Sequence, residues 1–151
     1  MSTTKDEIIS VLNDLIETCK DGQQGFLEAA EAVGDSDLRN TFNVYSQQRA
    51  RFAGELQNEV LRQGGDPAKT GHVSAKLHRG WMNLKAAITS KSEASIIAEC
   101  ERGEDSAVAN YEEALKKHLP AALETLVLNQ FRQVQEAHKR IRDLEKVRKA
   151  G

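Results

Sequence analysis

Apolar residues recur along most of this chain at alternating steps of four and three, which is the spacing of one buried face on an amphipathic helix. The first such stripe runs without a slip, and it consists of Ile8, Leu12, Leu15, Cys19, Gly22, Phe26, Ala29 and Val33. Thr4 and Glu7, just before it, have the spacing of a capping box. Gly34 ends the pattern, so the sequence predicts a first helix from about Thr4 to Val33.

Three more long stretches carry the same spacing, at about residues 37–63, 90–118 and 120–149. The stretch Gly64-Gly65-Asp66-Pro67 stops the first of them, and Pro120 fits the first turn of the last. The spacing of Ser90 and Glu93 predicts a capping box at the start of the middle one. The period-two alternation of β-strands is absent from the sequence.

These stretches predict an all-α fold with a single domain over residues 1–151. Short turns at 34–36 and 118–120 predict two antiparallel hairpins. We therefore expect an antiparallel four-helix bundle in up-down-up-down order, with an extra short helix between helices 2 and 3. That order makes the mostly acidic first helix and the mostly basic last helix neighbours, which suits their charges.

Three charged residues interrupt the apolar stripes. Arg49 stands on the stripe of the second helix. Glu101 and Glu104 stand on that of the third, which reads Ile97, Glu101, Glu104, Val108, Tyr111 and Leu115. Counting residues from the two short turns, taken to lie at the same end, places all three in one central layer. Because buried carboxylates are costly unless they are paired, we predict a buried polar network of Arg49, Glu101 and Glu104.

A metal centre is the alternative interpretation of the same layer. Its ligand pool would be Glu55, Glu101, Glu104 and His138, with Fe or Mn as the cofactor. Di-iron bundles carry Glu-x-x-His on two helices, and this sequence contains no such pair. A cation such as Arg49 would also repel metal ions, so the structural network is favoured.

Composition narrows the classes of function further. A net charge of −2 and a pI near 6.1 argue against a nucleic-acid partner. The sequence shows neither a membrane-spanning apolar run nor a signal peptide, so a cytoplasmic location is expected. Cys19 and Cys100 are interpreted as reduced core thiols. With no Ser-His-Asp or phosphate-loop motif, no catalytic residue is predicted.

Two longer motifs carry a resemblance to a known family. They are Leu77-His78-Arg79-Gly80-Trp81 and Glu99-Cys100-Glu101-Arg102-Gly103-Glu104-Asp105, accompanied by Asp21-Gly22 and Gln48-Arg49. Over nearly its whole length the chain resembles an uncharacterised, mainly proteobacterial family of ferritin-like four-helix-bundle proteins. The resemblance implies a ferritin-like fold and no established activity, substrate or cofactor. We expect a structural, stress-associated or partner-binding module, and the alternative is a ferroxidase-like or oxidoreductase protein that binds Fe or Mn.

Residues 74–89 form a shorter apolar stripe of Leu77, Trp81, Leu84 and Ile88. In the expected helix order, this segment would project beyond the bundle as a straight extension of the third helix and expose the stripe to water. We therefore predict a separate short helix. It would either fold across the open end of the bundle or be buried against a second subunit, which would make the protein a homo-oligomer.

Overall fold

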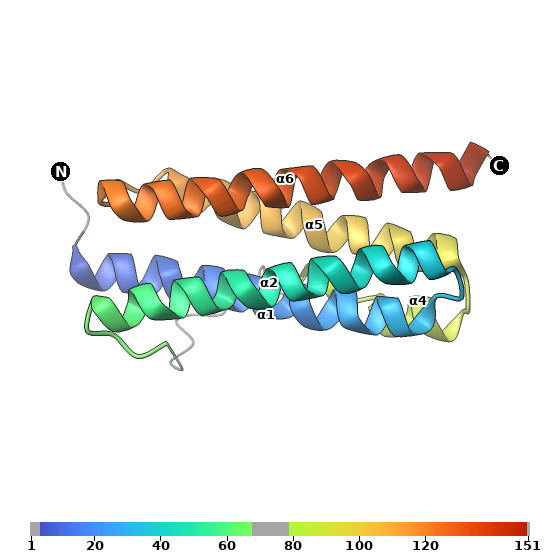
Figure 1. Cartoon of the computed structure of the whole chain (residues 1–151), viewed down its shortest axis with the longest axis horizontal. Helices are drawn as coiled ribbons and strands as arrows, with labels where there is room; N and C mark the ends of the chain where they lie inside the picture. Colours follow the sequence, from blue (N-terminus) through green and yellow to red (C-terminus); the bar gives the residue numbers. More distant parts are fainter. Residues whose placement is uncertain (1–3, 68–78, 151) are drawn as a thin grey trace.

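The computed structural model describes residues 4–67 and 79–150, and within these ranges the chain is helical with no strand (Figure 1). The helices are α1 (Lys5–Ala32), α2 (Ser36–Arg62), α4 (Leu84–Thr89), α5 (Glu93–Leu115) and α6 (Ala121–Ala150). A single 3-10 turn, η1 (Arg79–Trp81), precedes α4. The all-α prediction is confirmed for the part of the chain that the structure describes. Leu77 and His78 lie outside it.

Side-chain caps fix where the long helices begin. The Thr4 hydroxyl accepts a hydrogen bond from the amide of Glu7 at 3.2 Å, as the capping box predicts. Ser92 caps α5, whereas the sequence pattern pointed to Ser90. The reason is that the Glu93 carboxylate accepts hydrogen bonds from the amides of Gly34 and Asp35 instead, both at 3.3 Å. The start of α5 is thereby attached to the turn between α1 and α2.

This attachment corrects the expected order of the helices. The α1–α2 turn and the α5–α6 turn lie at opposite ends of the molecule, so α5 runs parallel to α2 and antiparallel to α1 (Figure 1). The helices therefore run up, down, down, up. The expected order is wrong because residues 63–92 form a connection long enough to return along the full length of the molecule before α5 begins.

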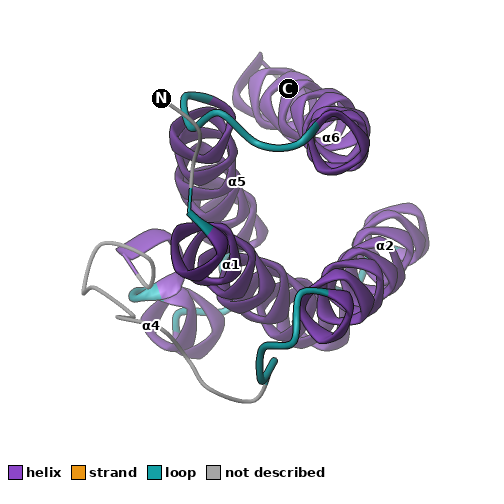
Figure 2. Ribbon diagram, turned by 90° about the vertical axis from the view of Figure 1, so that its left-hand side faces the viewer, coloured by secondary structure: helices purple, strands orange, loops and turns teal. Residues whose placement is uncertain are grey.

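The neighbours of each helix follow from this order. Helix α1 packs against both α2 and α5, and α5 packs against α6 (Figure 2). The acidic first helix and the basic last helix are thus not the close neighbours that we expected. Backbones of α2 and α6 approach each other little, and side chains join them, including Gln130 to Glu55 at 2.9 Å and Arg51 to Gln133 at 3.4 Å.

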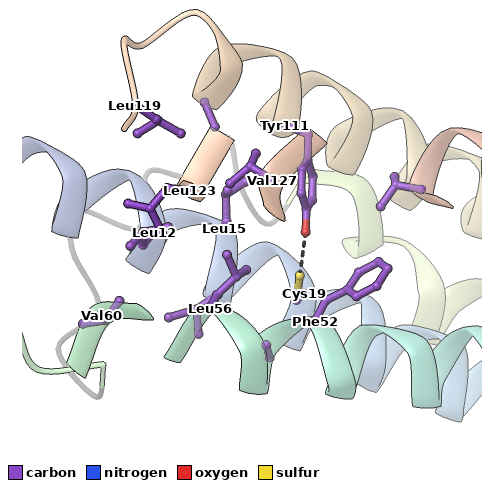
Figure 3. Packing of buried hydrophobic residues seen from close by; sticks show 14 of the residues in the cluster. Leu12, Leu15, Cys19, Phe52, Leu56, Val60, Tyr111, Leu119, Leu123 and Val127 are labelled. Atoms are coloured by element: carbon purple, nitrogen blue, oxygen red, sulfur yellow. Dashed lines mark hydrogen bonds between the residues drawn. The ribbon is translucent and has the colours of Figure 1, made fainter. Parts of the chain in front are cut away.

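The apolar core has two parts, one in each half of the molecule. One contains Leu12, Leu15, Leu56, Leu123 and Val127, and Figure 3 shows it in close-up. The other contains Phe26, Phe42, Ile96, Ile97 and Ile141. Polar side chains that are themselves buried lie at the middle of α2 and α5, where the two parts meet.

The described part of the connection, η1 and α4, lies along the side of α1 and α5 instead of across an end (Figure 2). Trp81 is half-buried there and meets the Phe26 ring edge-on, with 5.1 Å between ring centroids. A Cβ atom at either Gly25 or Gly103 would overlap the Trp81 ring, so these glycines provide the space in which it lies. Leu84 is also buried within the chain. The prediction of a separate short helix holds for α4, but this helix lies along α1 and α5 and not across the open end of the bundle.

Candidate functional site

Arg49 and Glu104 form the most deeply buried ion pair among the described residues. Their side chains are 1% and 0% exposed, and two parallel hydrogen bonds join them: Nη1 to Oε1 at 2.5 Å and Nη2 to Oε2 at 2.7 Å. Burial alone would lower the pKa of Arg49, but the charge and hydrogen bonds of Glu104 raise it above its ordinary value. Arg49 is therefore charged, and its guanidinium donates to both carboxylate oxygens of Glu104.

The helices around the pair are adapted to its size. A Cβ atom at Gly22 of α1 would lie 3.3 Å from both Cγ and Nη1 of Arg49, so the missing side chain provides space for the long guanidinium arm. The Phe26 ring lies 5.5 Å from Cζ of Arg49, within the range of a cation–π contact. Gly22 thus occupies a core position because Arg49 fills the volume that a larger residue would take.

A second chain of buried polar groups runs beside the ion pair. Sγ of Cys19 lies 3.2 Å from the Tyr111 hydroxyl (Figure 3). This hydroxyl donates to Oε1 of Gln130 at 2.7 Å. The Gln130 amide then donates to the Glu55 carboxylate at 2.9 Å. Burial raises the pKa of Cys19 to about 11 and also raises that of Tyr111, so both groups are neutral. The thiol is inert, and this chain connects all four long helices.

Glu101 is not part of the buried pair. Its side chain is 24% exposed and lies at the seam between α5 and α6, with Nε of Arg142 at 3.8 Å from its Oε1. A hydrogen bond with the Glu145 carboxyl, together with burial, raises the pKa of Glu101 above its ordinary value. The expected network of three residues therefore consists of Arg49 and Glu104, with Glu101 outside it.

His138 lies at the same seam. Its Nε2 is 2.5 Å from Oδ1 of Asp105, and its Nδ1 is 3.4 Å from Nη2 of Arg142. The structure thus divides the predicted metal ligands among three places. Glu104 is saturated by Arg49, Glu55 accepts from Gln130, and Glu101 and His138 lie together at the α5–α6 seam with Asp105.

Glu99 has a role that was not predicted from the sequence. Its side chain is 1% exposed, accepts the backbone amide of Asn83 at 2.5 Å, and lies 2.8 Å from Nη2 of Arg102. It thereby attaches the start of α4 to α5. The i,i+3 spacing of Glu99 and Arg102 was the only signal in the sequence, because nothing local links Glu99 to Asn83.

Two comparisons with known proteins bear on the site. Residues 7–117 match the model of a domain of unknown function (DUF2383), a range that contains nearly all of α1 and the whole of α2, α4 and α5. No curated protein matches the chain. In addition, no helix in residues 4–67 or 79–150 combines the length and apolar character needed to cross a membrane.

Proposed function

We propose that this chain, which belongs to the DUF2383 family, is a ferritin-like antiparallel four-helix bundle that acts as a non-catalytic structural or partner-binding module. The description of the family states no function, so the support comes from the geometry of the chain itself. A stress-associated role belongs to the same proposal.

One observation carries the proposal: a closed ion pair fills the middle of the core. In four-helix bundles, metal and cofactor sites are built there from inward-facing carboxylate and histidine side chains. Here Arg49 occupies both oxygens of Glu104, and its positive charge opposes the entry of a metal cation. A saturated pair of this kind stabilises one arrangement of helices and leaves no ligand position open.

The described part of the first family motif, Arg79–Trp81, packs on the second, which gives independent support. Gly80 lies so close to α5 that a Cβ atom there would be 2.6 Å from Cα of Gly103. Trp81 covers Gly103, and Glu99 accepts the amide of Asn83. Packing of η1 and the start of α4 on α5 therefore explains Gly80, Gly103 and Glu99, and no bound substrate is needed to explain them.

Iron oxidation provides the test. We expect the wild-type protein to oxidise Fe²⁺ no faster than buffer does. The double variant Arg49→Met/Glu104→Met should behave identically, and it should fold because apolar residues can replace both charges together. Saturable Fe²⁺ oxidation by the wild type that is lost in the double variant would refute the proposal.

The alternative is an Fe or Mn centre in the core that uses Glu55, Glu101, Glu104 and His138. It has weaker support, because these four side chains lie in three separate places. The iron assay distinguishes it from the structural proposal, since only the core centre depends on Glu104.

Self-association through residues 74–89 is also part of the proposal. Met82, next to Trp81, is 68% exposed and lines a surface groove of about 320 Å³ with Gln24 and Lys85. A second copy could cover this apolar side chain. Sedimentation of the wild type as a dimer, and of Met82→Lys as a monomer, would support self-association, whereas a monomeric wild type would exclude it.

A further inference from the structure

The seam between α5 and α6 gathers three side chains that are typical metal ligands. Glu101 and Asp105 are four residues apart, so they lie on one face of α5, and His138 faces them from α6. One ligand atom from each of the three lies within 4.8 Å of the other two. The group is distinct from the buried pair, to which none of its members is bonded.

We propose that Glu101, Asp105 and His138 bind a divalent transition-metal cation, of the class of Zn²⁺, Co²⁺, Mn²⁺ and Fe²⁺, at this seam. The set of one imidazole nitrogen and two carboxylate oxygens suits these ions, whereas Ca²⁺ prefers oxygen ligands alone. This site lies outside the core and goes beyond the proposed function, because it does not depend on the state of Arg49 and Glu104.

The exposure of the three side chains suits entry of an ion. His138 is 13% exposed, Glu101 is 24% exposed and Asp105 is 58% exposed. The site is therefore mostly buried at His138 and open to solvent at Asp105. Zinc–ligand distances are about 2.0–2.2 Å. Ligand atoms on one tetrahedral ion at these distances lie about 3.4 Å apart. The 2.5 Å contact between His138 and Asp105 must therefore open and Glu101 must approach, which the partly exposed carboxylates can do by rotation of their side chains.

Crowding of carboxyl groups gives a second, electrostatic reason. Glu145 on α6 is joined to Glu101 by a hydrogen bond, so two acids share this position beside Asp105. A bound divalent cation would offset this concentration of negative charge more closely than the guanidinium of Arg142, which lies 3.8 Å from Glu101.

Arg142 is the competitor that the proposal identifies. Its guanidinium reaches both Glu101 and Nδ1 of His138. A histidine that binds a metal through Nε2 carries its proton on Nδ1, and that N–H cannot accept from Arg142. Arg142 must therefore move when the ion binds, and its removal should strengthen binding.

Titration of the full chain with Zn²⁺ and Co²⁺ after chelator treatment tests the proposal, by calorimetry and by visible absorption of bound Co²⁺. We expect one ion per chain. His138→Ala and Glu101→Gln should each weaken binding by tenfold or more, and Arg142→Gln should strengthen it. Glu136→Gln removes the same charge from an exposed position on α6 and serves as the matched control, for which we expect wild-type affinity.

Circular dichroism of each metal-free variant checks that the fold is retained. The double variant Arg49→Met/Glu104→Met should bind the ion as the wild type does, which separates this site from the core centre. The absence of saturable binding would overturn the proposal. Equal losses in Glu136→Gln and Glu101→Gln would also overturn it, because they would indicate general attraction by negative charge.

Discussion

At the scale of single residues, the Arg49–Glu104 ion pair is the buried contact on which the stability of the core depends most directly. Breaking it from one side leaves the other charge buried without its partner, whereas removing both charges leaves an apolar core of similar volume. The free energy of unfolding therefore responds very differently to single and double substitution.

For Arg49→Met we predict a loss of about 3–5 kcal/mol in the free energy of unfolding, because Glu104 would remain buried and unanswered. The double variant Arg49→Met/Glu104→Met should recover most of this loss. Urea denaturation with a double-mutant cycle measures both. If the single variant kept the wild-type midpoint, the pair would not be important for stability.

Glu101 makes stability depend on pH in a defined direction. Its pKa in the folded protein is raised from the ordinary value of 4.5, first by the hydrogen bond with Glu145 and then by burial. The folded state therefore favours the protonated carboxyl. This contribution to stability is fully present below the pKa of the unfolded chain and is lost as the pH rises through the pKa of the folded protein.

Substitution of Glu101 by Gln removes this titration. In the presence of chelator, we predict that Glu101→Gln is more stable than the wild type at pH 7 and that the difference shrinks as the pH falls toward 4. Urea midpoints at several pH values measure the difference, with Glu136→Gln as the control for a lost surface charge. A difference that grows as the pH falls would contradict the assigned direction of the pKa shift.

The sequence identified both members of the core pair, Arg49 and Glu104, but misjudged one face of α5. Its buried residues include Ile97, Cys100, Glu104, Ala107, Tyr111 and Ala114. The predicted stripe favoured Glu101, Val108 and Leu115 instead, which are only partly buried. Small residues such as Cys100 and Ala107 are easily passed over, although they permit close packing of helices. That choice of face moved Glu101 into the predicted core.

At the scale of elements, the position of η1 depends on two glycines in the neighbouring helices. Trp81 lies over Gly25 of α1 and Gly103 of α5, and a Cβ atom at either position would overlap its ring. Glycine inside a helix normally costs about 1 kcal/mol relative to alanine. Glycine at these two positions therefore lowers the local stability of the helix but leaves the space in which Trp81 packs.

We predict that Gly103→Ala lowers the free energy of unfolding by about 1–3 kcal/mol through overpacking, in spite of the higher helix propensity of alanine. Trp81 fluorescence should shift toward longer wavelength as the ring becomes exposed. Gly54→Ala is the matched control, because a Cβ atom there has no neighbour within 4 Å. It should stabilise the protein, and equal effects of the two substitutions would exclude the packing explanation.

At the scale of the whole molecule, the sequence indicated the number of long helices but not their order. Amphipathic stripes and turn residues are local signals, and each long helix was predicted to within a few residues. The direction of α5 depends instead on where the 63–92 connection ends. A long connection can close at either end of the molecule at similar entropic cost, so its length does not determine the topology. Contacts such as Glu93 with the α1–α2 turn determine it.

Distances between the ends of the helices test this order directly. Ser36 begins α2, Ala94 lies in the first turn of α5, and Lys117 follows the end of α5; all three are exposed. Spin labels at Ser36→Cys and Ala94→Cys should lie near each other, because Glu93 bonds to Gly34 and Asp35. Labels at Ser36→Cys and Lys117→Cys should be separated by about the length of α5, roughly 35 Å at helical rise.

Pulsed electron spin resonance measures both distances in the folded protein. Cys19 and Cys100 are buried, so they should stay unlabelled, which mass spectrometry can verify. The up-down-up-down order would give the reverse result, with the 36–117 pair short and the 36–94 pair long. Because the two arrangements exchange the end of the molecule at which α5 begins, a single pair of distances separates them. The result also bears on the position of Trp81, because only the observed order places η1 and α4 beside α1 and α5.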